Sequence, residues 1–271
     1  MILVPTHPAA HYLGDACAWV AASLAGYGQY RLWPGEAQRL ARITAPSYFI
    51  WLALGGLGGA WLAGSLNTVP VGLAPSHSIA GALAGAIAGV ELWKWRHGVR
   101  GSTGGAFVLP IATGIMIGRW GCLFAGITDA TYGVPTRLPW GVDLGDGVAR
   151  HPVEVYESLA MALFIAGYVI ARQRGAGWAQ TRAFYAFVIW YGAQRFCWEF
   201  LKPYPTLLGP FNLFHGISLG LVAYGIAWWR SGDRAKSGGR AQGGALSVPQ
   251  PDHEPVRNLP GAGPGQSDHR G

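Results

Sequence analysis

The chain has 271 residues, of which 51% are hydrophobic and only 12% are charged. Soluble domains carry about 25% charged residues, so this composition excludes an ordinary soluble domain and indicates an integral membrane protein. The net charge of +7 does not indicate a nucleic-acid partner, because the lysines and arginines lie between apolar runs rather than on one face.

Seven apolar segments follow one another along the chain, each long enough to cross the hydrocarbon core of a bilayer. We predict transmembrane helices over residues 10–27, 47–65, 78–95, 105–125, 153–171, 183–201 and 211–229. The N-terminal residues lack the positive region of a cleavable signal peptide, so we expect the first segment to be retained. The predicted fold class is an all-α polytopic membrane protein. Asp15 lies inside the first segment, so we expect it to be buried and to need a partner.

The loops between these segments predict the orientation in the membrane. Lysine and arginine are concentrated after the first, third, fifth and seventh segments, whereas residues 66–76 contain neither. Positive loops stay in the cytoplasm, so the N-terminus is expected outside and the C-terminus inside. The membrane domain is then residues 1–230, with an outer-face loop at 126–152. Residues 231–271 have almost no large apolar side chains and are predicted to be a disordered cytoplasmic tail.

Small residues recur on one face of the third segment. Gly81, Gly85 and Gly89 are spaced four apart, which gives two overlapping GxxxG patterns. In lipid, such a stripe lets two helix backbones approach closely. The alternative interpretation is that the stripe leaves room for a lipid chain or head group.

Arginine and glutamate near the outer ends of the segments are the candidates for a site. Arg119 either extends to lipid phosphates as an anchor or turns inward to hold a phosphate, for which its planar fork is suited. Gly118 and Gly121 flank it and are expected to leave space for a head group.

A second pair of opposite charges lies in the sixth segment. Arg195 and Glu199 are one turn apart, so they share a face and are compatible with a simple internal ion pair. Glu157 and Arg119 are expected at a similar depth, however. Ionisable residues that converge inside a membrane mark a functional site by default.

The histidines and cysteines give weaker signals. His151 precedes Pro152, so it either caps the next helix or serves as an acid or base; His77 precedes the third segment and is more simply structural. The cysteines are odd in number and indicate free thiols. No zinc spacing or nucleotide loop is present, so neither a metal nor another cofactor is expected.

Four motifs follow one another along the chain: GRWGC at residues 118–122, TYG at 131–133, RHPVEVYE at 150–157 and RFCWEF at 195–200. In this order they resemble the motifs of the bacterial prolipoprotein diacylglyceryl transferase family. The family has GRxGN, a downstream glycine, RHPxxxYE and RxxxEF with similar spacing.

The resemblance implies a multi-pass enzyme of the bacterial inner membrane. Such enzymes transfer the diacylglyceryl group of phosphatidylglycerol to a cysteine thiol of a preprolipoprotein and release glycerol phosphate. Both the lipid and the signal-peptide helix of the preprolipoprotein are then partners that enter between helices. The implied catalytic residues are Arg119, Arg195, Glu157, Glu199, His77 and His151. The implied substrate-binding residues are Arg119, Gly133, Tyr132, Asp129 and Cys122.

Three departures from the family pattern stand out. Cys122 occupies the position of the motif asparagine, and the family's HGG aligns with residues 80–82, which lack histidine, so that His77 one turn earlier is the substitute. The family has a glutamate shortly after GRxGN, and in this sequence only Asp129 lies near that position. These departures favour a divergent paralogue. The alternatives are a related transferase with another acceptor, and a non-catalytic lipid-binding or transport protein, against which the lack of an internal repeat weighs.

Overall fold

The structure is a computed structural model that describes residues 1–69, 72 and 75–243. The chain divides into two units, residues 1–232 and 233–271, and the first unit contains the site described below. Its helices are α1 Ala10–Leu32, α2 Gly35–Ile43, α3 Pro46–Thr68, α4 Ile79–Arg96, α5 Val108–Ala125, α6 Val153–Gln173, α7 Gly177–Thr181, α8 Ala183–Glu199 and the start of α9 Leu213–Gly243. Two short 3₁₀ helices, η2 Gly105–Phe107 and η3 Gly126–Asp129, flank α5.

Each of the seven predicted segments coincides with one long helix: α1, α3, α4, α5, α6, α8 or α9. The short helices α2 and α7 were not predicted, because they lie in arginine-rich loops too short for an apolar run. Three stretches among the described residues are long and apolar enough to cross a membrane: Pro46–Thr68, Gly105–Asp129 and Val153–Gln173. Helix α9 continues beyond residue 230, where the tail was expected to begin, and residues 244–271 of that tail lie outside the described residues.

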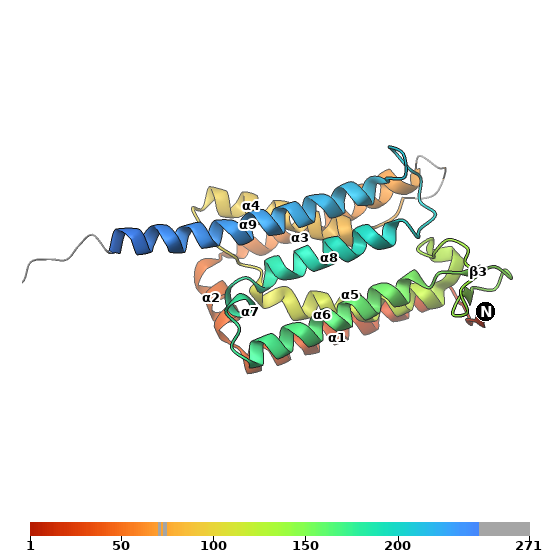
Figure 1. The fold of residues 1–271 in the computed structure, drawn as a ribbon, viewed down its shortest axis with the longest axis horizontal. Helices are drawn as coiled ribbons and strands as arrows, with labels where there is room; N and C mark the ends of the chain where they lie inside the picture. The colour runs from red at the N-terminus through yellow and green to blue at the C-terminus, as the bar shows by residue number, and fades with distance from the viewer. Residues whose placement is uncertain (70–71, 73–74, 244–271) are drawn as a thin grey trace, which may run out of the picture. The chain divides into compact units, whose positions relative to one another are not determined.

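A small sheet closes one end of the bundle. Strand β1 (Ile2–Leu3) pairs in parallel with β2 (Val142–Asp143), which pairs antiparallel with β3 (Ala149–Arg150). The sheet lies at the end of the bundle opposite to α2 and α7 (Figure 1). The N-terminus and the long central loop therefore occupy the same end of the bundle.

Helices α3 and α4 pack with their backbones in direct contact. A Cβ atom on Gly85 would overlap the carbonyl of Gly55 and lie 2.9 Å from the Cα of Gly59; Gly81 and Gly89 face the same helix. The glycine stripe is therefore a packing surface and leaves no room for a lipid chain, which resolves the two interpretations of its GxxxG patterns.

The main hydrophobic core lies among α4, α5, α6, α8 and α9. Phe164, Phe187, Val188 and Phe214 are at most 8% exposed and pack together there. Ser158 of α6 also donates a hydrogen bond to the Met116 carbonyl of α5, at 2.8 Å. This core fixes the relative positions of the helices that carry the charged residues.

The glycine contact between α3 and α4 gives the first prediction. Gly59→Ala places its Cβ 2.8 Å from the Cα of Gly85, so we expect a loss of about 1–3 kcal/mol in the free energy of unfolding. Gly58→Ala on the same helix is the control, since nothing lies within 4 Å of its added Cβ. Thermal unfolding in detergent measures both. Equal unfolding midpoints for the two variants would contradict the close contact.

Candidate active site

Five buried charges form one network at the end of the bundle that carries the sheet. They are Arg119 on α5, Glu157 on α6, Arg195 and Glu199 on α8, and Lys202 just beyond α8, and each is 5% exposed or less. The structure thus brings together all four residues that the sequence predicts to converge, and it adds a lysine.

Glu157 accepts contacts from three cations. Its Oε2 pairs with Nε of Arg119, and its Oε1 lies 2.5 Å from Nη1 of Arg195 and 3.0 Å from Nζ of Lys202. Arg119 is therefore turned inward and does not extend to the lipid surface as an anchor. Because three elements meet at one carboxylate, a small shift of α6 would separate all three pairs.

Glu199 completes the network and connects it to α9. The other amino group of Arg195, Nη2, lies 2.5 Å from Glu199 Oε1 one turn away, while Asn212 Nδ2 donates to Glu199 Oε2 at 3.1 Å. Asn212 also accepts hydrogen bonds from the backbone N–H groups of Phe214 and His215, so it caps α9. The start of α9 is thereby fixed to the charged site.

The network carries an excess of positive charge. Among the described residues, Arg119, Arg195 and Lys202 form ion pairs only with Glu157 and Glu199, so three cations share two carboxylates and one positive charge is unmatched within these pairs. Buried charges are strongly disfavoured without a counter-charge. The unmatched cation therefore favours the arrival of an anionic group.

Several buried polar atoms near the network lack a hydrogen-bond partner among the described residues. They are the hydroxyls of Tyr191 and Ser218, both amide atoms of Gln194, Nε of Arg195, Nε1 of Trp198 and Nε2 of His215. The large majority of buried side-chain polar atoms in proteins have at least one hydrogen-bond partner. They lie on α8 and the first turns of α9, so a polar ligand beside the network would supply the partners that these atoms lack.

A second polar cluster lies beside Arg119. Nη1 of Arg119 is 3.9 Å from the sulfur of Cys122, and Asp129 Oδ1 lies 2.6 Å from Nδ1 of His11. Asp129 also accepts from the hydroxyl of Thr131 at 2.7 Å. Asp129 thus interacts with His11 of α1 and with Thr131 of its own loop. It does not pair with the arginines, so it does not replace the glutamate that the family has shortly after GRxGN.

Asp15 differs from the sequence expectation. Its side chain is 56% exposed, because α1 turns it away from the core, and its partner is His11 one turn earlier at 3.4 Å. Glu154, in contrast, is 2% exposed and accepts from Thr131 at 3.3 Å, so it borders the network without a recorded ion pair among the described residues.

Three predicted residues in the outer loop have local roles. Tyr132 lies under the guanidinium of Arg150, at 5.2 Å from ring centroid to Cζ. A Cβ on Gly133 would overlap the carbonyl of His151, and the His151 ring lies 3.5 Å from the hydroxyl of Tyr156. These residues shape the loop above the network.

His77 is exposed, and no described hydrogen bond or ion pair joins its side chain, or that of His151, to the network.

Gly121 also differs from the expectation. A Cβ on it would lie 2.7 Å from the Cα of Gly14, and one on Gly118 would lie 3.6 Å from the Cβ of Ala18. The two glycines therefore pack α5 against α1 and do not leave space for a head group.

The sequence analysis missed Lys202 and Asn212 as site residues. A signal existed for each: Lys202 is the one lysine or arginine between the sixth and seventh apolar segments, and Asn212 directly precedes an apolar run, as a helix cap does. Neither signal says that the side chain reaches the arginines, since that depends on how the loop folds back.

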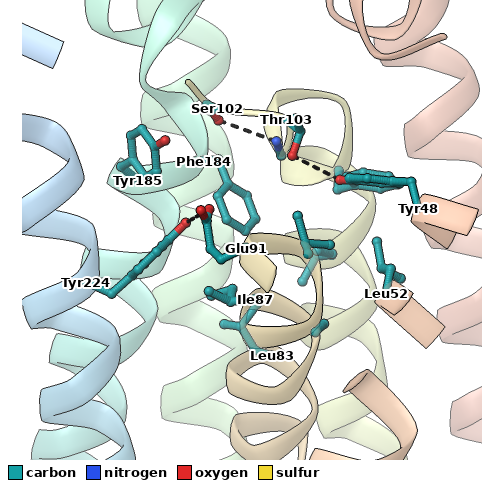
Figure 2. Close-up of a pocket in the computed structure, with 15 residues that line it drawn as sticks. Tyr48, Leu52, Leu83, Ile87, Glu91, Ser102, Thr103, Phe184, Tyr185 and Tyr224 are labelled. Atoms are coloured by element: carbon teal, nitrogen blue, oxygen red, sulfur yellow. Dashed lines mark hydrogen bonds between the residues drawn. The ribbon is translucent and has the colours of Figure 1, made fainter. Parts of the chain in front are cut away.

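The bundle also contains a cavity of about 190 Å³ that shares no lining residue with the network. Figure 2 shows its polar groups: Tyr224 donates to Glu91 at 2.7 Å, and Tyr48 donates to Thr103 at 3.0 Å. Most of its wall is apolar, including Leu83. It lies around the later turns of α4 and the first turns of α8, away from the charged end.

The apolar helices and the buried ionic network together define a helical membrane protein with a charged internal site. The chain belongs to the prolipoprotein diacylglyceryl transferase family, whose family model matches residues 36–230.

Curated relatives agree with this assignment. Proteins named phosphatidylglycerol–prolipoprotein diacylglyceryl transferase are 33% identical over 121 residues in Finegoldia magna (44% of this chain, 46% of the relative) and over 144 residues in Cupriavidus pinatubonensis (49% and 50%). In Fervidobacterium nodosum the value is 33% over 132 residues (45% and 43%). The chain thus spans about half the length of these relatives. No solved structure matches it significantly.

The central carboxylate gives the second prediction. Glu157→Gln leaves three buried cations with one carboxylate, so we expect a loss of about 3–5 kcal/mol in the free energy of unfolding. Asp146→Asn is the control, because Asp146 pairs with Arg150 in the exposed loop, and its loss should change stability little. Unfolding midpoints in detergent measure both. A Glu157→Gln variant as stable as the control would show that the network is not held by this carboxylate.

Proposed function

We propose that the protein transfers the diacylglyceryl group of phosphatidylglycerol to the cysteine thiol of a preprolipoprotein lipobox, with release of glycerol phosphate. The observation that carries the proposal is the unmatched positive charge inside the buried network, beside polar atoms that have no hydrogen-bond partner among the described residues. Phosphatidylglycerol supplies both complements: an anionic phosphate and a glycerol with hydroxyls. The names of the curated relatives describe the same reaction.

The network suits the leaving group of this reaction. The thiolate sulfur attacks the glyceryl carbon that bears the phosphate oxygen, a carbon–sulfur bond forms, and the carbon–oxygen bond breaks with its electron pair on glycerol phosphate. Arg119, Arg195 and Lys202 would stabilise that negative charge, since preorganised donors are most effective where charge develops. Glu157 and Glu199 would hold the two guanidinium groups in place, which makes all four predicted charged residues part of the site.

The outer loop would complete the site from above. We assign Cys122, Asp129, Tyr132 and Gly133 to its wall, because Cys122 lies beside Arg119 and the other three belong to the loop that follows. Neither His77 nor His151 is used in the proposed reaction, since no described interaction connects either side chain to the network.

We also propose that all seven long helices cross the bacterial inner membrane, with the N-terminus outside and the C-terminus in the cytoplasm. Helix α1 is counted among the seven membrane-spanning helices although it carries Asp15, because it exposes a row of large apolar side chains. They include Tyr12, Leu13, Trp19, Val20 and Leu24. The network then lies beneath the external surface, within reach of a signal-peptide helix that enters between the helices.

One observation favours a second candidate, a transferase that uses the same lipid and a different acceptor. Cys122 replaces the motif asparagine, and it contacts Arg119 through sulfur at 3.9 Å, where an amide would donate and accept stronger hydrogen bonds. The group next to the first arginine is therefore altered.

The third prediction tests the transferase function. Purified protein with labelled phosphatidylglycerol and a lipobox peptide should yield a thioether product and glycerol phosphate. Arg119→Ala should lower turnover by about 10²–10³-fold, as the loss of one preorganised donor does in other enzymes. Arg137→Ala is the matched control, because Arg137 is exposed in the outer loop, and its turnover should remain unchanged.

Each alternative outcome has a distinct meaning. Turnover that Arg119→Ala leaves intact would contradict the role of Arg119. Saturable lipid binding without product from any peptide would favour a lipid-binding protein, and product from a non-peptide thiol alone would favour the second candidate.

The fourth prediction concerns pH. Burial lowers the pKa of the Lys202 ammonium below its ordinary value of about 10.4, and Arg195 lowers it further, while Glu157 opposes both. The charge of Lys202 is therefore lost at a lower pH than that of an exposed lysine, and turnover should fall on the alkaline side as it is lost. Lys202→Arg keeps the charge and should shift that fall to higher pH. Identical alkaline limbs in the two pH profiles would rule out Lys202 as the titrating group.

A further inference from the structure

Three side chains of different elements bring metal-binding atoms together beside the ionic network. His11 of α1, Cys122 of α5 and Asp129 of η3 each offer one ligand atom, and these atoms all lie within 4.8 Å of one another. We propose that they form a binding site for a divalent transition-metal ion, with Zn²⁺ as the preferred ion. The proposal does not depend on the transferase function.

The donor set selects the kind of metal. One thiolate, one imidazole and one carboxylate are the ligand types that Zn²⁺ uses, whereas Mg²⁺ and Ca²⁺ prefer oxygen donors only. Three protein ligands also leave a fourth tetrahedral position for water or an external ligand. Binding would release the thiol proton of Cys122 to solvent, because the thiolate is the form that binds the metal.

Groups behind the ligands orient two of them as in known metal sites. Nδ1 of His11 faces Asp129, and its other ring nitrogen, Nε2, lies 3.4 Å from Oδ2 of Asp15. The free oxygen of Asp129, Oδ2, accepts from the hydroxyl of Thr131 at 2.7 Å. Metal-bound histidines usually donate their second N–H to a carboxylate, and bound carboxylates are usually hydrogen-bonded in turn. This arrangement also accounts for the presence of a carboxylate, Asp15, in an apolar helix.

The site combines a buried sulfur with a partly exposed histidine in the first turn of α1. Cys122 is 8% exposed, whereas the side chain of His11 is 39% exposed, so an ion can enter from the His11 side. Nη1 of Arg119 lies 3.9 Å from the sulfur, so a bound ion would sit next to the first arginine of the ionic network. His11 and Asp129 are 118 positions apart in the sequence, which explains why spacing along the chain gave no sign of this site.

Co²⁺ binding tests the proposal, because cobalt replaces zinc and reports thiolate ligation by colour. Full-length protein without a histidine tag should bind about one Co²⁺ per chain at the proposed site, with a thiolate-to-cobalt charge-transfer band that Zn²⁺ abolishes. Cys122→Ser should lose the band. Cys17→Ser is the matched control, since Cys17 is an exposed free thiol on α1, and it should keep the band.

A second variant guards against misfolding. Asp129→Asn keeps Cys122 and the size of the side chain but should weaken Co²⁺ binding by about tenfold or more. The elution profile of each variant reports whether it is folded. Zn²⁺ should also raise the unfolding midpoint of the wild-type protein and leave that of Cys122→Ser unchanged. A folded Cys122→Ser that retains the band, a band lost in Cys17→Ser, or no band in the wild-type protein would overturn the proposal.

Discussion

The carboxylate of Glu157 is the interaction on which the rest of the charged site depends. It receives Arg119 from α5, Arg195 from α8 and Lys202 from the following loop, all within a region that excludes water. In such surroundings a charge without its partner is strongly unfavourable, so each cation restricts where the others can lie. The three elements are thereby held in one arrangement.

The two ends of the bundle differ in their chemistry. The charged end carries the sheet, the outer loop and the network, and the opposite end carries the largely apolar cavity of Figure 2 with Glu91. An amphiphilic lipid needs both kinds of surroundings. Among the described residues, the network of five buried charges lies at the charged end, which is why the head group is assigned there.

Much of the fold could be predicted because it depends on local patterns. Apolar runs predict the seven long helices, and the one-turn spacing of Arg195 and Glu199 predicts their pair. Arg119 and Glu157 could be singled out because ionisable residues are rare in such runs. The motifs around these two residues resemble those of the prolipoprotein diacylglyceryl transferase family, and the family model matches residues 36–230.

The features that could not be predicted depend on contacts between distant residues. The pairing of Ile2 with Val142 and the contact of His11 with Asp129 join residues that are more than 100 positions apart in the chain. The role of Gly121 was misjudged for the same reason, because its neighbour Gly14 lies on another helix. Lys202 reaches Glu157 only because the loop after α8 turns back over the network.

The most direct measurement of the central claim is an experimental structure of the protein with phosphatidylglycerol bound. We expect the phosphate oxygens within hydrogen-bond distance of Arg119, Arg195 or Lys202, with the glycerol next to the unpartnered polar atoms of Gln194 or His215. A phosphate bound elsewhere, with the five charges paired among themselves as before, would contradict the claim that this network holds the head group.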